Sequence, residues 1–337
     1  MGRRNVLIIG NAYTPSYQIG IRQPFLLLEK EKDYRFETKW DWEVTKETIS
    51  KFDVVILFRT VKQRSLDCLM WAKELGKKTV YFIDDHFLAI PMKASLGKRY
   101  ADPEIRRLYT EFLRKADVVK VDSSFFSQHI RTHFNRNAVY FPASVDFSYV
   151  DKLEARQRTD NTIVIGYEGG SKDSAFSPVV PAILRILEKY RGRVRVEFMG
   201  YIPSALKSHH RVTYIEGDPN YRSFLKRFKQ ASWDIGLAPL EHTLFDDCKT
   251  NNKFREYAAC SVPGIYSATP AYRDGVIHRE TGMYAASNPD SWASCMEQLI
   301  EDAELRRKIR LNAGEYARKH YSIARCAEQW HKLVLGV

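Results

Sequence analysis

The chain alternates short apolar strands with helices, and it does so in each half of its length. In the first half, β-branched runs such as "NVLIIG", "DVVILF" and "DVVKVD" are separated by helical stretches. Continuous apolar strands between helices indicate a parallel sheet covered on both faces. The helices expected in this half span residues 21–32, 62–75, 103–115 and 125–134.

The second half begins the same pattern again. "TIVIGYEGG" predicts a strand that leads into a glycine turn, and "RVEFMG", "VTYIEG", "WDIGLAPL" and "VPGIYS" predict further strands. Helices are expected at 179–190 and 221–230, and the tail from 289 to 335 is predicted to be almost entirely helical. We therefore predict an α/β protein with two Rossmann-like, doubly wound domains that face each other across a cleft. The predicted boundaries are 1–150, a polar linker 151–160, 161–320, and a C-terminal helix 321–337 that crosses back to the first domain.

Composition narrows the class of protein further. No apolar run approaches the roughly 18 residues that a membrane-spanning helix needs. The five cysteines are odd in number and widely spaced, which favours a reducing, cytoplasmic location. They contain no Cys-x-x-Cys pair, which argues against a zinc site. The net charge is +12, and residues 1–150 carry 25 Lys and Arg against 18 Asp and Glu. Such an excess suits nucleic acid, anionic lipid head groups or phosphate-bearing substrates, and it also simply favours solubility.

Phosphate binding is the function that two motifs of the second half favour. Neither half contains a Walker loop or Gly-x-Gly-x-x-Gly, which argues against an NAD enzyme. The loop "GYEGGSKD" follows a strand directly, so its backbone amides could approach an anion. The alternative is a purely structural glycine turn. The candidate residues of this loop are Gly169, Gly170, Ser171 and Lys172.

The second motif is "KTNNKFREYAACSVPG", which predicts a short helix that ends at Pro-Gly. The free amides of its first turn would attract a diphosphate, and Glu256 one turn later could bind the two hydroxyls of a ribose. The alternative is an ion pair of Glu256 with Lys253 on a solvated face. The candidate residues of this motif are Lys249, Thr250, Asn251, Asn252, Lys253 and Glu256.

These motifs occur in an arrangement that resembles a known family. "DIGLAPL…F…K…NKFREYAACSVPGIYS" resembles the C-terminal domain of GT-B glycosyltransferases of the family-4-like retaining group, also called glycosyl transferases group 1. "IVIGYEGGSKD" resembles the opening of that domain, and "TGMYAASNPDSWASCMEQLIEDAELRRKIRLNAGEYARKHYS" resembles its tail. "TVYFIDDHF" and "VVKVDSSFFSQHI…AVYFPASVD" resemble the N-terminal domain of the group.

The resemblance implies a nucleotide-sugar donor on the second domain and an acceptor on the first. Glu256 matches the second glutamate of a pair that marks the family's donor site, whereas the first glutamate falls on Cys248. Asp246 and Asp247 are adjacent and could substitute for it. The diphosphate-binding role of the family is assigned to Lys172 and Lys249, and the departing phosphate would take the proton of the acceptor.

Three further features complete the sequence-based assignment. Asp84 and Asp85 end a strand, where the resemblance implies acceptor binding; the alternative is a charged turn. Their adjacency does not match the Asp-x-Asp metal motif of the other glycosyltransferase fold, so no essential metal and no further cofactor are expected. Tyr221 would pack on the base or belong to the core.

The sequence therefore predicts a retaining glycosyltransferase for a polysaccharide, glycolipid or related acceptor. The partners are a nucleotide-sugar donor and a saccharide or lipid-linked acceptor, with peripheral contact to the anionic inner face of the membrane. The alternatives are an epimerase or phosphorylase on the same fold and an inactive relative that still binds nucleotide sugars. A nucleic-acid-binding protein is disfavoured, because the sequence lacks the interleaving of basic and aromatic residues typical of RNA binding.

Overall fold

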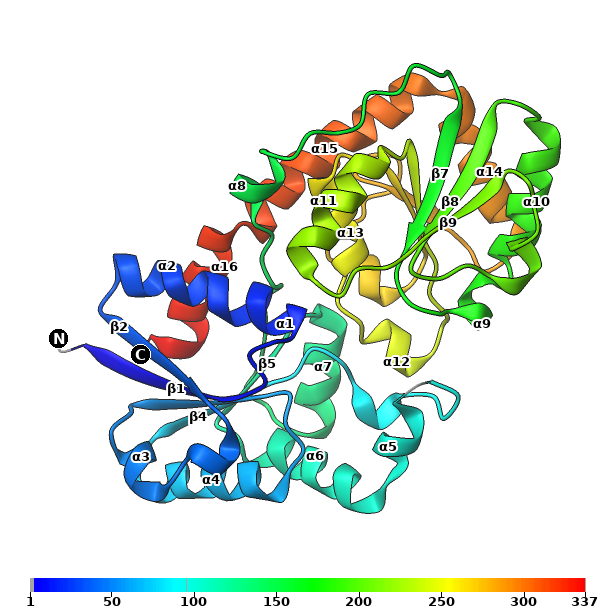
Figure 1. Cartoon of the computed structure of the whole chain (residues 1–337). Coiled ribbons are helices and arrows are strands. Elements are labelled where there is room, and N and C mark those ends of the chain that lie inside the picture. Colours follow the sequence, from blue (N-terminus) through cyan, green and yellow to red (C-terminus); the bar gives the residue numbers. More distant parts are fainter. Residues whose placement is uncertain (1–2, 95, 337) are drawn as a thin grey trace. The chain divides into compact units, whose positions relative to one another are not determined.

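A computed structural model describes residues 3–94 and 96–336 of the chain (Figure 1). The chain forms two compact units, each built on one six-stranded parallel sheet. The predicted α/β architecture with two Rossmann-like sheets is thereby confirmed. The first unit comprises Met1–Ser144, Thr243–Thr250 and Tyr321–Val337, and the second comprises Val145–His242 and Asn251–His320.

The sheet of the first unit has the strand order β2-β1-β3-β4-β5-β6. β1 lies between β2 and β3, so the chain changes direction across the sheet at β1. Side chains alternate between the two faces, as the period of a strand requires. The strands are β1 (Arg4–Gly10), β2 (Tyr34–Lys39), β3 (Val54–Phe58), β4 (Lys78–Phe82), β5 (Val118–Val121) and β6 (Ala138–Tyr140).

Helices cover both faces of this first sheet. Leu7 and Ile9 of β1 pack in one core with residues of α3, α4, α6 and α7, whereas Val6 and Ile8 pack in another with residues of α2 and the C-terminal segment. The helices of this unit are α1 (Pro15–Tyr17), α2 (Gln23–Glu31), α3 (Lys46–Ser50), α4 (Gln63–Glu74), α5 (Gly97–Ala101), α6 (Pro103–Lys115), α7 (Ser124–His133), α12 (Leu244–Asp247) and α16 (Ile323–Gln329).

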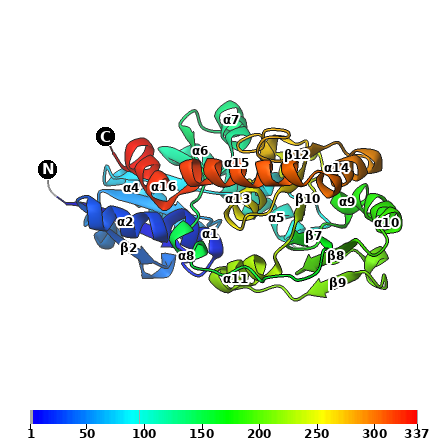
Figure 2. The ribbon, with the colours of Figure 1, turned by 90° about the horizontal axis from the view of Figure 1, so that it is seen from above.

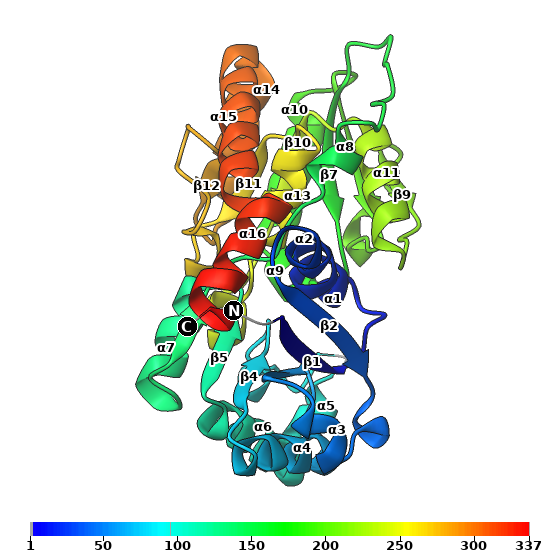
Figure 3. The ribbon, with the colours of Figure 1, turned by 90° about the vertical axis from the view of Figure 1, so that its left-hand side faces the viewer.

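The C-terminal segment packs back on the first unit, as predicted. α16 lies beside α2, and both belong to the same core (Figures 1 and 3). Trp330 follows α16, is fully buried, and its indole Nε1 donates a 2.7 Å hydrogen bond to the carbonyl oxygen of Gly20. The apolar residues that the sequence shows at Cys326, Ala327, Trp330 and Val334 are the ones buried here.

The second sheet has the strand order β12-β11-β10-β7-β8-β9. Its strands are β7 (Ile163–Glu168), β8 (Val194–Met199), β9 (Val212–Ile215), β10 (Ile235–Ala238), β11 (Gly264–Ser267) and β12 (Met283–Ala285). Figure 2 shows α10 beside α14, and these two helices contribute Ile183 and Met296 to the core of this unit. The helices are α8 (Phe147–Val150), α9 (Asp173–Phe176), α10 (Val179–Lys189), α11 (Tyr221–Ala231), α13 (Asn252–Ala259), α14 (Pro289–Glu301) and α15 (Ala303–Tyr321).

Two segments lie in other units than the predicted boundaries place them. Residues 145–150, predicted as the end of the first domain, and the predicted linker 151–160 are both part of the second unit, where Arg158 donates a 2.6 Å hydrogen bond to Asp234. The segment Thr243–Thr250 belongs to the first unit, since Cys248 is fully buried in its core. Along the sequence, therefore, the change of unit occurs immediately before α13. No helix of the described residues is long and apolar enough to cross a membrane.

Candidate functional site

The predicted glycine loop begins where β7 ends, at Glu168. Gly169 has φ +129°, a backbone conformation that favours glycine. A Cβ atom at this position would lie 2.8 Å from Nζ of Lys253, so the absent side chain makes room for the lysine. Gly170 and Ser171 are exposed, and the Ser171 hydroxyl donates to Asp173 at 3.1 Å. The side chain of Lys253, from the first turn of α13, therefore lies against the backbone of this loop.

The start of α13 carries the second predicted motif. Asn251 is the residue that precedes the helix, but its side chain makes no capping hydrogen bond. The first amides of a helix have no partner within it, and they carry the positive end of the helix dipole. Nζ of Lys253 lies 2.7 Å from Oε1 of Glu168 and also donates to the Glu168 carbonyl oxygen. The start of a helix beside a lysine is a suitable place for an anion.

Glu256 lies inside the second unit rather than on a solvated face, and only 9% of it is exposed. Burial and the neighbouring Glu168 raise the pKa of Glu256 to about 8, against the attraction of Lys253 and Arg255. The Tyr221 hydroxyl is buried near it, and burial together with Glu256 raises the pKa of Tyr221. We call the side chains of Glu168, Lys253 and Glu256 the donor cluster. This cluster contains two carboxyl groups and one ammonium group.

Glu168 is a residue that sequence reasoning missed. It was quoted within "GYEGGSKD" but received no role, although it is the last residue of a buried strand and is itself 5% exposed. A carboxylate at such a place needs a cation, because an unpaired buried charge is expensive. That rule could have drawn attention to Glu168 before the structure did. It could not have named Lys253, which lies 85 positions further along the chain.

Two more glycines stand beside the loop at the carboxyl ends of β8 and β9. A Cβ atom on Gly200 would lie 2.9 Å from the carbonyl oxygen of Gly169, and one on Gly217 would lie 3.1 Å from the Cα atom of Gly200. Three loop backbones therefore approach one another here without side chains between them. Ligands of parallel sheets bind at this end of the strands.

The predicted acceptor residues of the first unit form a different cluster. Asp84 is 5% exposed, and its carboxylate faces Arg59, whose Nη1 donates to Oδ2 at 3.1 Å and whose Nε lies 3.1 Å from Oδ1. Arg59 has φ +47°, which is unusual for a residue other than glycine. Burial raises the pKa of Asp84 and the neighbouring Asp85 adds to this, whereas Arg59 opposes it.

Lys249 belongs to this acceptor-side cluster and not to the donor cluster. Its Nζ lies 3.6 Å from Oδ1 of Asp85 and 4.0 Å from the ring centroid of Phe245. Asp247 and Thr250 are likewise in the first unit. Cys248 is fully buried, and burial raises the pKa of its thiol to about 12. An uncharged core thiol cannot stand in for the carboxylate that the family pattern has at this position.

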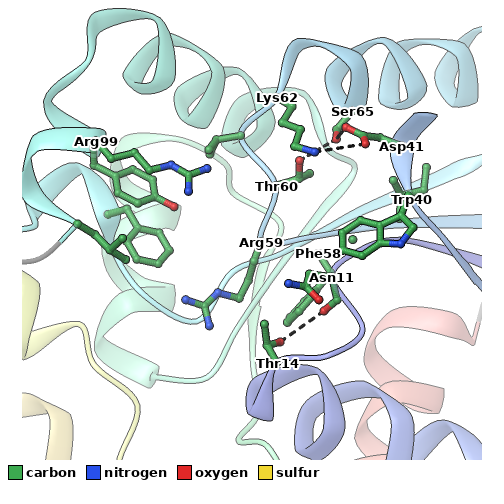
Figure 4. Close-up of a pocket in the computed structure, with 16 residues that line it drawn as sticks. Asn11, Thr14, Trp40, Asp41, Phe58, Arg59, Thr60, Lys62, Ser65 and Arg99 are labelled. Carbon is green, nitrogen blue, oxygen red and sulfur yellow. Dashed lines mark hydrogen bonds and ion pairs between the residues drawn. The ribbon is translucent and has the colours of Figure 1, made fainter. Parts of the chain in front are cut away.

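The first unit also contains a pocket of about 320 Å³ where β1, β2 and β3 end (Figure 4). Figure 4 shows Arg99 and Trp40 on opposite walls, with Thr60 and Lys62 along one side and Arg59, Asn11 and Thr14 along the other. Its lining residues are Ile9, Gly10, Asn11, Thr14, Trp40, Asp41, Phe58, Arg59, Thr60, Val61, Lys62, Ser65, Phe87, Leu96, Arg99 and Tyr100.

Metal-ligating side chains do not gather in the part of the chain that the structure describes. Within residues 3–94 and 96–336, no group of three His, Cys, Asp or Glu side chains could hold a metal ion.

Comparison with known proteins gives structural but not sequence matches. No protein-family model matches the chain, and no curated protein matches its sequence. HepE of Anabaena in complex with UDP-glucose is similar over 99% of this chain and 100% of its own, with a TM-score of 0.70 and 13% identity. A glycosyltransferase of Rickettsia africae ESF-5 matches over all of both chains, with a TM-score of 0.69 and 13% identity. Sucrose-phosphate synthase of Thermosynechococcus elongatus matches over 98% of both chains, with a TM-score of 0.68 and 13% identity.

These matches span the whole length of each protein, so they concern the complete pair of sheets and not one common Rossmann-like half. The chain therefore has the two-sheet fold known as GT-B, and the fold implied by the sequence resemblance is confirmed. At 13% identity the likeness establishes the fold alone.

Proposed function

We propose that the chain is a glycosyltransferase that moves a sugar from a nucleotide-diphosphate sugar to a polysaccharide, glycolipid or related acceptor, with retention of anomeric configuration. The observation that carries this proposal is the donor cluster at the start of α13, beside a loop in which Gly169 has φ +129° and leaves room for Lys253. The crystal structure of HepE with UDP-glucose supports it, since that protein of the same fold binds a nucleotide sugar.

Each part of the donor cluster has a role in this proposal. The amides of residues 251–253 and the ammonium of Lys253 would bind the diphosphate, with Lys172 from the glycine loop adding positive charge. Glu256 would bind the ribose, and Tyr221 would contact the base. Preorganised groups of this kind contribute about 2–4 kcal/mol each to stabilising developing negative charge.

The reaction then needs little from a protein base. The bond between the anomeric carbon and the phosphate oxygen breaks, and the nucleoside diphosphate leaves with the electron pair. The bond from the anomeric carbon to the acceptor oxygen forms on the same face. The departing phosphate takes the proton of the acceptor hydroxyl, so Asp84 and Asp85 would orient the acceptor rather than accept its proton. No metal is required by this scheme.

Glu168 would hold Lys253 in position between turnovers. Without a ligand, Lys253 is paired with Glu168, which keeps a buried ammonium neutralised. An incoming diphosphate would share Lys253 with Glu168, so the lysine is held in place before the ligand arrives. Such preorganisation reduces the entropy lost on binding.

The first test is a thermal-shift panel with UDP, GDP, dTDP, ADP and CMP, with and without EDTA. A nucleotide at 100 times its dissociation constant stabilises a protein by about 2.7 kcal/mol. We expect one nucleotide to shift the wild type and not Glu256→Ala, with EDTA making no difference. Glu315→Ala is the matched control, because Glu315 is exposed on α15 of the same unit. If no nucleotide shifts the wild type, the proposal fails.

Turnover assays distinguish the alternatives. An epimerase would convert the donor without an acceptor, and a phosphorylase would split a glycosidic bond only with inorganic phosphate. An inactive relative would bind nucleotide and convert nothing. A nucleic-acid-binding protein would instead bind oligonucleotides with a steep salt dependence. For a transferase, the product's anomeric configuration by NMR should equal that of the donor.

Membrane contact is a separate part of the proposal. The excess of basic residues in 1–150 would attract the chain to an anionic membrane surface, where a lipid-linked acceptor would be found. We expect binding to anionic vesicles at low salt and release at high salt. Absence of binding at low salt would contradict this part alone.

A further inference from the structure

The pocket of the first unit has the position of a ligand site in its sheet. It opens at the carboxyl ends of β1, β2 and β3, and β1 is the strand from which the chain proceeds in opposite directions across the sheet. Crevices at such switch points are where open parallel sheets bind ligands. Its volume of about 320 Å³ lies within the range of small-molecule sites, which is roughly 300–1,000 Å³.

One wall of the pocket is an aromatic platform. The indole of Trp40 is stacked on that of Trp42, with ring centroids 4.9 Å apart and an interplanar angle of 8°. Tyr13 lies 6.5 Å from Trp40, and its side chain is 84% exposed. Tyr13 and Trp42 are exposed and Trp40 is partly exposed, so together the three rings offer an apolar surface with polar groups at its rim. The apolar face of a sugar ring fits such a surface, and Asn11, Thr14 and Thr60 provide polar groups for its hydroxyls.

The opposite walls are cationic. Lys62 is close to Asp41, with 3.5 Å between Nζ and Oδ1, and Asp41 is also satisfied by the Ser65 hydroxyl at 2.9 Å. Arg59 is held by Asp84 from outside the pocket lining. Two of the three cations that line the pocket are therefore matched by carboxylates.

Arg99 is the remaining cation. It is exposed on α5, its guanidinium carbon lies 5.8 Å from the ring centroid of Tyr100, and no carboxylate within residues 3–94 and 96–336 forms an ion pair with it. Figure 4 shows its guanidinium directed into the pocket, across from Trp40. A planar guanidinium binds a carboxylate or phosphate through two parallel hydrogen bonds.

We propose that this pocket binds a saccharide that carries a negative charge, its ring on Trp40 and its carboxylate or phosphate on Arg99. The inference rests on the proposed function in making this saccharide the acceptor of the transfer. A uronic acid and a sugar phosphate are the two sources of the same chemistry. The acceptor would thus be an anionic polysaccharide or a phosphate-bearing glycan rather than a neutral one.

The experiment is a saturation-transfer NMR titration of the full chain with methyl glucoside, methyl glucuronide and glucose 6-phosphate, with the donor site saturated by the nucleotide identified above. We expect at least one anionic sugar to bind more tightly than methyl glucoside. Arg99→Gln should weaken that anion about tenfold, equivalent to about 1.4 kcal/mol, and leave methyl glucoside unchanged. Trp40→Ala should weaken both sugars. Arg114→Gln is the charge-matched control, because Arg114 is exposed on α6 and does not line the pocket.

Three results would overturn the inference. They are equal binding of neutral and anionic sugars, an Arg99→Gln variant whose anion affinity stays within twofold of the wild type, and no binding of any of the three sugars. The preference between methyl glucuronide and glucose 6-phosphate identifies the source of the charge. Nucleotide shifts measured on the same variants separate the two proposals: they should persist in Arg99→Gln and vanish in Glu256→Ala.

Discussion

The two strand-end clusters contain the same carboxylate count but different numbers of cations. The donor cluster has Glu168 and Glu256 around one lysine, and both carboxylates are at most 9% exposed. The acceptor-side cluster has Asp84 and Asp85 with both Arg59 and Lys249. In the first cluster, burial and the neighbouring Glu168 outweigh the attraction of Lys253 and Arg255, so Glu256 has a raised pKa and holds its proton tightly. In the second cluster, two cations face two carboxylates. The two clusters therefore differ in charge: the donor cluster has one lysine beside a protonated carboxyl group, and the acceptor-side cluster has two cations beside two carboxylates.

The largest effect is expected from Arg59→Ala, which removes the main cation of Asp84. Leaving a buried carboxylate without its partner lowers the free energy of unfolding by about 3–5 kcal/mol. Alanine does not relieve the strain of the φ of +47°, because it has a Cβ atom like arginine. Urea denaturation at pH 7 measures the loss. The double variant Arg59→Ala/Asp84→Asn should recover most of it, because no buried charge remains. Equal losses in the single and double variants would show that charge is not the cause.

Lys253→Met is expected to cost about 3 kcal/mol, since it leaves the buried carboxylate of Glu168 without the lysine that pairs with it. The loss should be greater at pH 8 than at pH 5, because repulsion requires both carboxylates to be ionised. Urea denaturation of Lys253→Met and the wild type at the two pH values measures this loss. The thermal shift caused by the nucleotide should also disappear in Lys253→Met. A loss that is the same at both pH values would argue against coupling of Glu168 and Glu256.

Glu256 predicts a pH dependence of stability. Its pKa is raised from 4.5 to about 8 in the folded chain, so the folded state holds this proton more tightly than the unfolded state. The resulting stability is complete below pH 4.5 and is lost as pH rises through about 8, at about 1.4 kcal/mol for each pKa unit. Between pH 5 and 8, stability should fall less in Glu256→Gln than in the wild type. Parallel profiles of the two proteins would contradict the assigned shift.

The smallest effect is expected from Lys249→Ala. Lys249 is 22% exposed, its distance to Asp85 is 3.6 Å, and Arg59 remains near the carboxylates. Partly exposed pairs contribute about 0–1 kcal/mol, so the variant should unfold almost like the wild type. Its effect should instead be on turnover, because Lys249 lies beside Asp85, which is proposed to orient the acceptor. A loss as large as that of Lys253→Met would remove the contrast between the two clusters.

Local patterns predicted much of the secondary structure correctly. The helix expected at 103–115 is α6, and the one expected at 179–190 is α10 to within one residue. The two strands without a sequence signal, β2 and β12, are both sheet edges. Edge strands are paired on one side only, and β2 is partly exposed along most of its length, so it lacks a continuous apolar run.

Short-range patterns in the sequence were enough to predict the two sheets, the glycine loop and the helix that follows it, because the spacing of apolar residues and the turn residues act over short distances. It also identified Glu256 and Lys253 as residues of one motif. Tertiary structure alone decided which carboxylate faces which lysine: Lys249 pairs with Asp85 and Lys253 with Glu168, although only four positions separate the lysines. It also decided that Cys248 is a core residue. These outcomes depend on which strands lie side by side in the folded sheets, and that information is carried by contacts between residues far apart in the chain.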